Sequence, residues 1–488
     1  MHRRNRRTGT KALLAVSAAI AAIAASASPA AAQSDTEVVT LDRDLVRLNT
    51  SNPPGNEAQV ADFMRDKLAP LGFETDVIQT PTPGKAHLIA RLRSANPVGK
   101  PIVLCAHADT VGVERELWSV DPFAGTIRGD FLYGRGSFDD KGGIAVFAAA
   151  AMRLARAHVP LTRDIVLVFE ADEEGGDYGI DWLAENHWDK LDAAYSINEG
   201  GIISTEGGKP RLAAVTVRDK ISFSVVLQTR GVSTHSSRPQ PPNAIDRLAR
   251  ALAKISRHQG RPKLSRLTRT YLRALARASK GRQATELRRL AAAHRSGKIA
   301  RLSRRVIRRS AFGPLLSALM RTTFTSTIVE GGIRSNVIPG IAEATVNMRL
   351  LPGVTGEQAV RELRRTIHDR SVKIIVGSDD QTPAEAYKSI RERQRIAASS
   401  TDTDLYRSLA REVKAQYPGT VVTRALYEAG TDAEPWREHG IPVYGLRPYA
   451  ASAAVLEDMH GVDERVSITE LNKGTDMVER ILRAVAGG

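Results

Sequence analysis

The sequence predicts an α/β protein in which helices cover both faces of a mainly parallel sheet, with a second α+β unit inserted into it. Apolar runs at residues 101–105 and 164–170 have the continuity of strands that are buried on both faces. These runs alternate with helical patterns, as in α/β domains. At Lys220 the pattern changes to the alternation of half-exposed antiparallel strands, and from about Thr401 it changes back.

The first part of the chain supplies the α/β elements in order. Residues 40–71 have a helical pattern, which a loop rich in proline and glycine interrupts at 50–57. A glycine-punctuated loop at 121–136 separates the first two strands from a long helix. The expected elements are strands at 87–92, 101–106 and 164–170 and an alanine-rich helix at 141–160.

The inserted unit is expected between residues 218 and 377, in a βαββαβ-like order. It divides the other domain into a first part, residues 33–217, and a second part, residues 378–488, in a chain of 488 residues that is too long for one ordinary domain. Residues 379–400 read as a polar linker with a short helix. The expected elements of the insertion are strands at 221–228, 325–329, 342–349 and 372–376 and a helix at 356–369.

The N-terminus has the pattern of a secretory signal peptide, residues 1–32. Arginines precede a short alanine-rich apolar run at 12–25, and Ala30, Ala31 and Ala32 offer a cleavage site. A membrane anchor is the alternative, and the run is short for one. A twin-arginine signal is disfavoured because Thr8-Gly9-Thr10 follows the arginines. The sequence therefore predicts an exported, periplasmic or secreted protein without an integral membrane segment after processing.

Charge and cysteine content add two constraints. The chain has a net charge of +16, and residues 254–309 alone hold 19 Lys and Arg against one acidic residue, Glu286. Apolar residues recur there at helical spacing, so amphipathic helices with a solvated basic face are expected rather than a nucleic-acid site. Attraction to anionic lipid or acidic substrates is the alternative. Cys105, the single cysteine, excludes an internal disulfide and reads as a buried structural thiol.

Histidines and carboxylates gather in five short segments that lie beside strand-like runs or glycine-rich turns. Because ligands of α/β sheets bind at the carboxyl ends of strands, these segments predict a shared site. Two histidines and three carboxylates suffice for two zinc ions if one carboxylate bridges them, which leaves Asp109 and Glu173 for supporting and acid–base work. The other candidate ligands in these segments are His107, Asp139, Asp140, Asp172, Glu174, Glu199 and His460.

The adjacent glutamates Glu173 and Glu174 point in different directions in an extended segment. One can therefore bind metal while the other takes a proton from water and returns it to a leaving amine. His107 and Asp109 are two residues apart at a strand end, so Asp109 can support His107 by a hydrogen bond. A serine nucleophile at residues 233–237 is disfavoured because the segment lacks the Gly-x-Ser-x-Gly pattern.

Taken together, these segments resemble the co-catalytic zinc exopeptidases and aminoacylases, the group of carboxypeptidase G, carboxypeptidase S, aminoacylase and succinyl-diaminopimelate desuccinylase. The helical insertion and residues 347–353 are most similar to the carboxypeptidase S branch. One departure is Gly112, where the family usually has proline; a slightly more flexible loop is expected. The matching segments are residues 105–111, 118–123, 133–142, 171–175, 198–200, 231–236, 336–339, 430–433 and 459–461.

The resemblance implies a role for each ligand. Asp139 would bridge two zinc ions, with His107 and Glu199 completing one site. Glu174 and His460 would complete the other. Glu173 would be the general base, and Asp109 would orient His107.

The resemblance also implies a three-layer zinc-exopeptidase catalytic domain with an inserted ferredoxin-like lid or dimerisation domain. His235 would stabilise the oxyanion, and a homodimer through the inserted domain is possible in this family. Asn336 and Arg349 would hold the carboxylate or backbone of the substrate. Gly430 and Thr431 would form a loop on the substrate side.

The resulting prediction is a secreted dinuclear zinc metallopeptidase of the carboxypeptidase type, acting on peptides with a free C-terminal carboxylate. An N-acyl-amino-acid amidohydrolase, of the aminoacylase or desuccinylase type, is the alternative, because both reactions need the same metal core. A zinc-binding protein without turnover would lack the base, and Glu173 argues against it. Residues 254–309 are expected to lie in the inserted domain, away from the metals.

Overall fold

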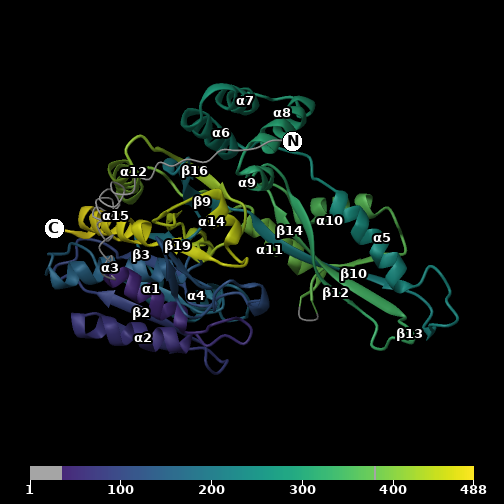
Figure 1. The fold of residues 1–488 in the computed structure, drawn as a ribbon, viewed down its shortest axis with the longest axis horizontal. Helices are drawn as coiled ribbons and strands as arrows, with labels where there is room; N and C mark the ends of the chain where they lie inside the picture. Colours follow the sequence, from purple (N-terminus) through teal and green to yellow (C-terminus); the bar gives the residue numbers. More distant parts are fainter. Residues whose placement is uncertain (1–35, 379–380) are drawn as a thin grey trace, which may run out of the picture.

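A computed structural model of the protein describes residues 36–378 and 381–488. The predicted signal peptide lies outside these residues. Figure 1 shows the two main sheets side by side, the larger one near the C-terminus of the chain and the smaller one at the opposite end. Within the described residues, no helix is both long and apolar enough to cross a membrane.

The larger sheet has ten strands, and its centre is the parallel group β6, β3 and β7. All six residues of β3 and of β6 are buried, as their continuous apolar sequences predict. The strands, in sheet order, are β1 (Glu74–Gln79), β2 (Ala86–Leu92), β6 (Ile165–Glu170), β3 (Ile102–His107), β7 (Tyr195–Asn198), β17 (Val443–Gly445), β9 (Lys209–Asp219), β8 (Ile202–Glu206) and β18 (Ala450–Ala451), with β16 (Val421–Tyr427) paired to β9.

Helices cover both faces of this sheet, so the predicted three-layer α/β fold is confirmed. Side chains alternate along β3: Leu104 joins the core on one face, and Val103 and Cys105 join the core on the other. The burial of Cys105 agrees with its prediction as a structural thiol. One face carries α1 (Glu37–Arg47), α2 (Ala58–Leu68), α3 (Lys141–Arg156), α12 (Asp404–Gln416) and α15 (Ile468–Ala486), and the other carries α4 (Ile180–Leu191) and α13 (Glu434–Glu438).

The smaller sheet has four antiparallel strands in the order β12-β14-β10-β15. Burial alternates along β10 and β14, because one face of the sheet packs on helices α5 and α10. The chain order βαββαβ with this strand order is the ferredoxin-like arrangement. The elements are β10 (Ile221–Arg230), α5 (Ala244–Arg257), β12 (Thr323–Gly331), β14 (Ile341–Leu350), α10 (Gly356–Ile367) and β15 (Lys373–Ile375).

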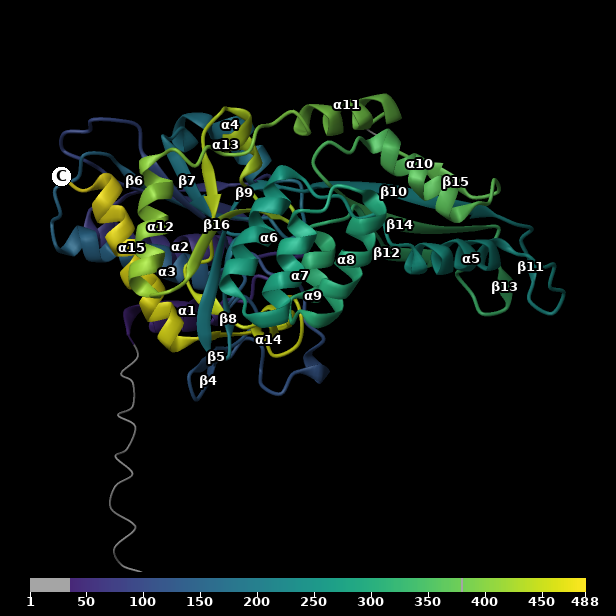
Figure 2. The ribbon, with the colours of Figure 1, turned by 90° about the horizontal axis from the view of Figure 1, so that it is seen from above.

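Four helices are inserted between α5 and β12, and their apolar stripes are buried as the helical spacing predicts. They do not stay with the smaller sheet: α6 packs on β16 and β9 of the larger sheet, as Figure 2 shows. The prediction placed residues 254–309 in the inserted domain, away from the metals, whereas α6 lies against the larger domain. The helices are α6 (Arg266–Ala278), α7 (Gly281–Ala291), α8 (Ser296–Arg309) and α9 (Gly313–Ala318).

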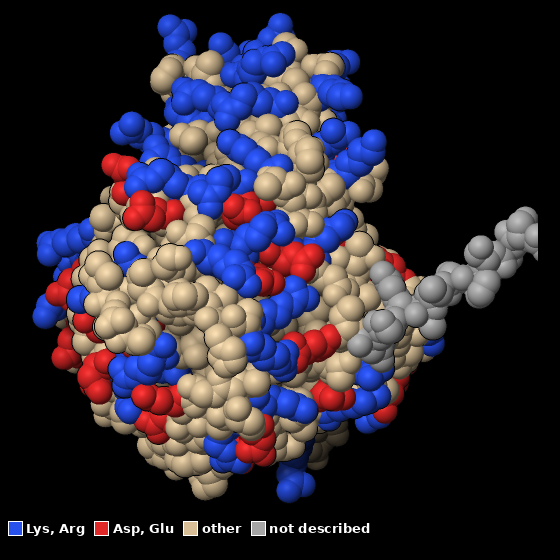
Figure 3. Space-filling model, turned by 90° about the vertical axis from the view of Figure 1, so that its left-hand side faces the viewer, with Lys and Arg blue, Asp and Glu red and all other residues tan. Residues whose placement is uncertain are grey.

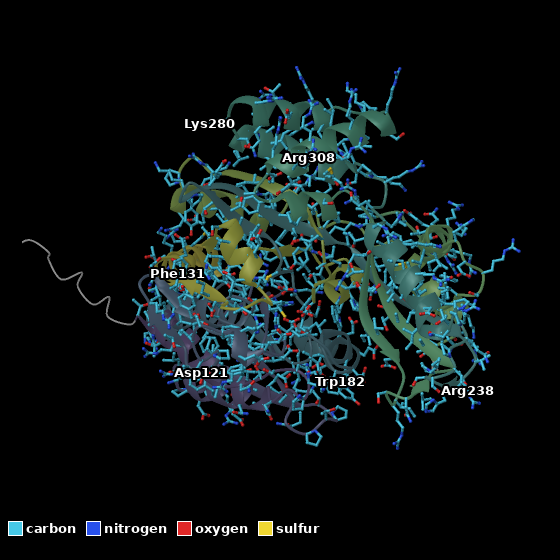
Figure 4. The ribbon with its side chains drawn as sticks, turned by 45° about the vertical axis from the view of Figure 1, so that its right-hand side comes forward. Asp121, Phe131, Trp182, Arg238, Lys280 and Arg308 are labelled. Carbon is cyan, nitrogen blue, oxygen red and sulfur yellow. The ribbon has the colours of Figure 1, made fainter. Side chains whose placement is uncertain are left out.

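The basic residues of this insertion lie on its outer side, where Lys and Arg dominate the top of the molecule in Figure 3. Lys280 and Arg308, which Figure 4 labels on this insertion, are both exposed. Glu286 is buried and is held by Arg282 and Arg309. The remaining elements are a helix α11 (Pro383–Arg393) in the predicted linker, α14 (Ala453–Asp458), the turns η1 (Ala69–Leu71) and η2 (Arg115–Leu117), a small sheet of β4 (Thr126–Arg128), β5 (Phe131–Tyr133) and β19 (Arg465–Ser467), and the pair β11 (Thr234–His235) and β13 (Val337–Ile338).

Candidate metal centre

Three segments that carry predicted ligands leave neighbouring parallel strands at the same edge of the larger sheet. His107 is the last residue of β3, Glu173 and Glu174 follow β6, and Glu199 follows β7 directly. Asp139 lies just before α3, and His460 lies just after α14. The sheet topology thus brings together residues that are up to 353 positions apart in the sequence, because parallel strands end at one edge.

The five predicted ligands form two groups that share Asp139. In the first group, potential ligand atoms of His107, Asp139 and Glu199 all lie within 4.8 Å of one another. The second group joins Asp139 with Glu174 and His460 within the same limit. The structure therefore brings all five predicted ligands to one place.

The two carboxylate oxygens of Asp139 face different histidines. Its Oδ1 is 3.2 Å from His107 Nε2, and its Oδ2 is 3.2 Å from His460 Nε2. A tetrahedral zinc with bonds of about 2.0–2.2 Å holds two ligand atoms roughly 3.3 Å apart. The geometry and the N/O donor set therefore fit two zinc ions with Asp139 between them.

Arg447 is a buried cation in this cluster that the sequence reasoning missed. Its guanidinium donates to Asp139 Oδ1, and to Glu199 Oε2 at 2.6 Å. Burial alone would raise the pKa of Asp139, but Arg447 and the two histidines hold this pKa well below its usual value. Arg447 follows strand β17, so its place after an apolar run was a signal that could have identified it.

Glu464, also missed, holds the loop that presents Asp139. Its Oε1 accepts hydrogen bonds from the backbone N–H groups of Gly136, Phe138 and Asp139 at 3.0–3.1 Å. Its Oε2 pairs with the buried Arg135. Nothing in the local sequence around Glu464 distinguishes it from a surface glutamate, because its partners are more than 320 residues away.

Asp109 lies beside both His107 and the glutamate pair. Its carboxylate accepts hydrogen bonds from the backbone N–H of Glu173 at 3.2 Å and of Glu174 at 2.9 Å. His107 Nδ1 lies 3.0 Å from the Asp109 backbone carbonyl and 3.6 Å from its carboxylate. The side-chain amide of Asn52 donates hydrogen bonds to the carboxylates of both Asp109 and Asp172. The sequence did not predict this link.

Glu173 lies beside the predicted ligands but belongs to neither of the two groups that contain Asp139. Its carboxylate lies within 4.8 Å of ligand atoms of Glu199 and Asp432. Burial raises the pKa of Glu173 well above its usual value, and the Asp432 carboxylate raises it further. A carboxyl group in this position can exchange a proton with a molecule bound in the cleft.

A cleft of about 660 Å³ contains this cluster. Arg349, from strand β14 of the smaller sheet, lines the cleft together with Gly430 and Thr431 from the larger domain. A Cβ atom on Gly430 would lie 3.4 Å from Arg349 Nη1, so the two domains meet at this point. The structure thus brings three of the predicted substrate residues to the cluster.

His235 and Asn336 are not among the residues that line this cleft. They lie in and beside the β11–β13 pair, at the far end of the smaller sheet in Figure 1, and both are exposed. His235 Nδ1 lies 2.8 Å from Ser237 Oγ. Arg238, in the same loop, is labelled in Figure 4 at that end of the molecule. Within the described chain, these two predicted residues stay apart from the metal ligands.

An α/β sheet with histidines and carboxylates clustered beyond its parallel strand ends is the arrangement of a metal-dependent hydrolase. A family model described as "Peptidase family M20/M25/M40" matches residues 103–484. The chain belongs to this family, which confirms the resemblance drawn from the motifs and makes the protein an enzyme of the metallopeptidase and amidohydrolase class.

The chain is also similar to curated relatives, and it shares its fold with solved structures. The chain is 28% identical over 429 residues to human N-fatty-acyl-amino acid synthase/hydrolase PM20D1, which covers 86% of this chain and 81% of the relative. It is 27% identical over 395 residues to the probable carboxypeptidase S-like 2 of Dictyostelium discoideum, covering 79% and 71%. The M20 metallo-carboxypeptidase Sso-CP2 of Sulfolobus solfataricus shares the fold with a TM-score of 0.66 at 17% identity, covering 92% of this chain and 99% of that one.

Proposed function

We propose that the protein is an exported dinuclear zinc amidohydrolase that releases an amino acid with a free carboxylate. The observation that carries this proposal is the pair of ligand groups that share Asp139, at spacings that suit tetrahedral zinc. His107, Asp139 and Glu199 would hold one ion, and Asp139, Glu174 and His460 the other. Bound zinc would supply Lewis acidity toward a carbonyl oxygen and lower the pKa of water.

The remaining residues act around this centre. Glu173 takes the proton from the attacking water and returns it to the leaving amine, since it lies beside the ligands and on the wall of the cleft. Asp109 keeps the Glu173–Glu174 segment in place through two backbone hydrogen bonds. Arg349 pairs with the free carboxylate of the substrate, because guanidinium groups bind carboxylates in two-point contacts. Gly430 and Thr431 close that side of the cleft.

Two substrate classes share this chemistry. A carboxypeptidase would cleave a peptide before its last residue, and the M20 carboxypeptidase and carboxypeptidase S-like relatives support it. An N-acyl-amino-acid hydrolase would cleave the same amide with an acyl chain in place of the peptide. The relative described as an N-fatty-acyl-amino acid synthase/hydrolase supports this second candidate, and so does an apolar cavity beside the cleft.

A substrate panel on zinc-loaded protein tests the proposed function. Dipeptides and N-acyl amino acids with a free carboxylate should be hydrolysed, and the same compounds with an amidated C-terminus should react at least about 10-fold more slowly, because a guanidinium–carboxylate contact contributes roughly 1.5–3 kcal/mol. Release of the amine, measured by chromatography, is the readout. Absence of hydrolysis with every member of the panel would contradict the proposal.

His235 and Asn336 do not line the cleft of their own chain, so we expect them to act in the cleft of a second copy. The β12 edge of the smaller sheet is open, and its Ile328 and Val329 are 53% and 62% exposed. An open apolar edge strand is a template for pairing with another chain. We therefore propose that two copies pair through β12, and that each supplies His235 to the cleft of the other.

Introducing charged residues on the β12 edge tests whether two copies pair there. In a variant that carries both Ile328→Lys and Val329→Lys, sedimentation should show a monomer, and kcat should fall about as far as in His235→Ala. The matched change Val98→Lys, at an 84% exposed site in the other domain, should alter neither property. A monomeric double variant that keeps full kcat, or an unmodified protein that is monomeric and active, would contradict a partner-supplied His235.

A further inference from the structure

A second cavity, of about 340 Å³, lies between the helical insertion and the larger sheet. Helices α6 and α9 form one wall, and strands β9 and β16 form the other. Its volume falls in the range of small-molecule sites, roughly 300–1,000 Å³. Its walls are largely apolar and include Tyr271, Phe312, Leu315, Leu319, Ala425 and Leu426.

This cavity adjoins the metal cleft. Tyr427, Glu428 and Met459 line both of them, and Met459 directly precedes the predicted ligand His460. Arg447 lines the apolar cavity while its guanidinium contacts Asp139 and Glu199. The two spaces therefore meet at these shared side chains.

The two ends of the space differ in chemistry. Arg349 lines only the metal cleft, where a free carboxylate finds a cationic partner. The charged lining of the apolar cavity consists of Glu428, Glu457 and Arg447, and Arg447 is already paired with the ligand carboxylates. Peptide groups placed among its aliphatic walls would lose hydrogen bonds to water, which costs free energy, whereas an alkyl chain has none to lose.

We propose that this cavity binds the acyl chain of an N-acyl amino acid, so that the helical insertion sets the preference of the enzyme for long aliphatic acyl groups. The inference rests on the proposed amidohydrolase function and adds the substrate class and the element that selects it. It also gives the insertion a role at the active site: its apolar side covers the acyl chain, while its basic side faces solvent.

The wild-type enzyme should respond steeply to acyl-chain length. Each buried methylene contributes about 0.8 kcal/mol, or about fourfold in kcat/KM. Across N-acetyl, N-hexanoyl and N-dodecanoyl derivatives of one amino acid, kcat/KM should rise by at least 100-fold and then level off once the cavity is full. A flat series on an enzyme that does hydrolyse these amides would overturn the acyl pocket and leave the proposed function standing.

Filling the cavity should remove this preference. Ala318 lies on the α9 wall, and Ala318→Trp should lower the dodecanoyl-to-acetyl ratio of kcat/KM at least 30-fold. The matched change Ala292→Trp, at an exposed site after α7 in the same insertion, should leave the ratio within twofold. Leu315→Ala enlarges the cavity and should move the plateau to longer chains, which provides a second test if Ala318→Trp does not fold. An unchanged ratio in folded variants, or an effect only on the choice of amino-acid side chain, would overturn the proposal.

Measuring substrate affinity in a variant with impaired catalysis tests the acyl pocket independently of the rate of hydrolysis. N-dodecanoyl amino acid should bind Glu173→Gln at least 100-fold more tightly than the N-acetyl compound, by calorimetry, and Ala318→Trp in that background should abolish the difference. Equal affinities would sink the acyl pocket. Tight chain-dependent binding without hydrolysis by the parent enzyme would instead leave the pocket standing and contradict the proposed amidohydrolase function.

Discussion

Glu173→Gln is expected to lower kcat by about 10²–10⁴-fold, the usual contribution of a general base. The substitution keeps the size of the side chain and its hydrogen-bonding capacity but removes the group that accepts a proton. Zinc content and substrate affinity should stay close to those of the unmodified enzyme, because Glu173 belongs to neither group that shares Asp139. Measuring kcat, KM and zinc stoichiometry on the same preparations separates chemistry from metal binding.

The neighbouring change Glu174→Gln is the matched control. Both glutamates receive their backbone support from Asp109, so the two variants perturb the same segment. Glu174→Gln should lose zinc, since its Oε1 lies 2.7 Å from His460 Nε2 in the second ligand group. An unchanged kcat in Glu173→Gln would contradict the mechanism. Zinc loss in Glu173→Gln with retention in Glu174→Gln would show that the two roles are reversed.

The main elements of the fold were predictable because the pattern of apolar residues along each segment determines whether it forms a buried strand, a half-exposed strand or a helix. Continuous apolar runs at 101–105 and 164–170 became the buried strands β3 and β6, and the alternating run that starts at Ile221 became β10. The position of the helical insertion was not predictable in the same way. Helical spacing shows that residues such as Tyr271 and Leu272 are buried, but not that β16 and β9 cover them.

The residues of the candidate site likewise differ in how far the sequence predicts them. The five predicted metal ligands stand in short motifs, and three of them end or follow strands of the larger sheet, so sequence and topology together point to them. Arg447 and Glu464 contact partners far away in the sequence, and a lone charged residue in a sequence is usually taken for a surface residue. The distance from His235 to the metal ligands depends on how domains and copies are arranged, which no local pattern encodes.

Asp139→Ala is expected to abolish both metal sites at once. Its two oxygens face His107 and His460 separately, so its loss leaves each group with two ligands. Even outer partners of metal ligands change affinity by about 10–100-fold, so losing the shared ligand should weaken both sites by at least about 100-fold. Activity should fall with the metal, because no other carboxylate lies in both groups.

Zinc stoichiometry tests the shared role of Asp139 most directly. After dialysis against a weak chelator, elemental analysis should find about two zinc ions per chain in the unmodified protein and fewer than about 0.2 in folded Asp139→Ala. Asp189→Ala, at an exposed site on α4, should keep both ions. Two tightly bound zinc ions in Asp139→Ala, or one retained ion with the other lost, would contradict a centre built on a carboxylate that both metals share.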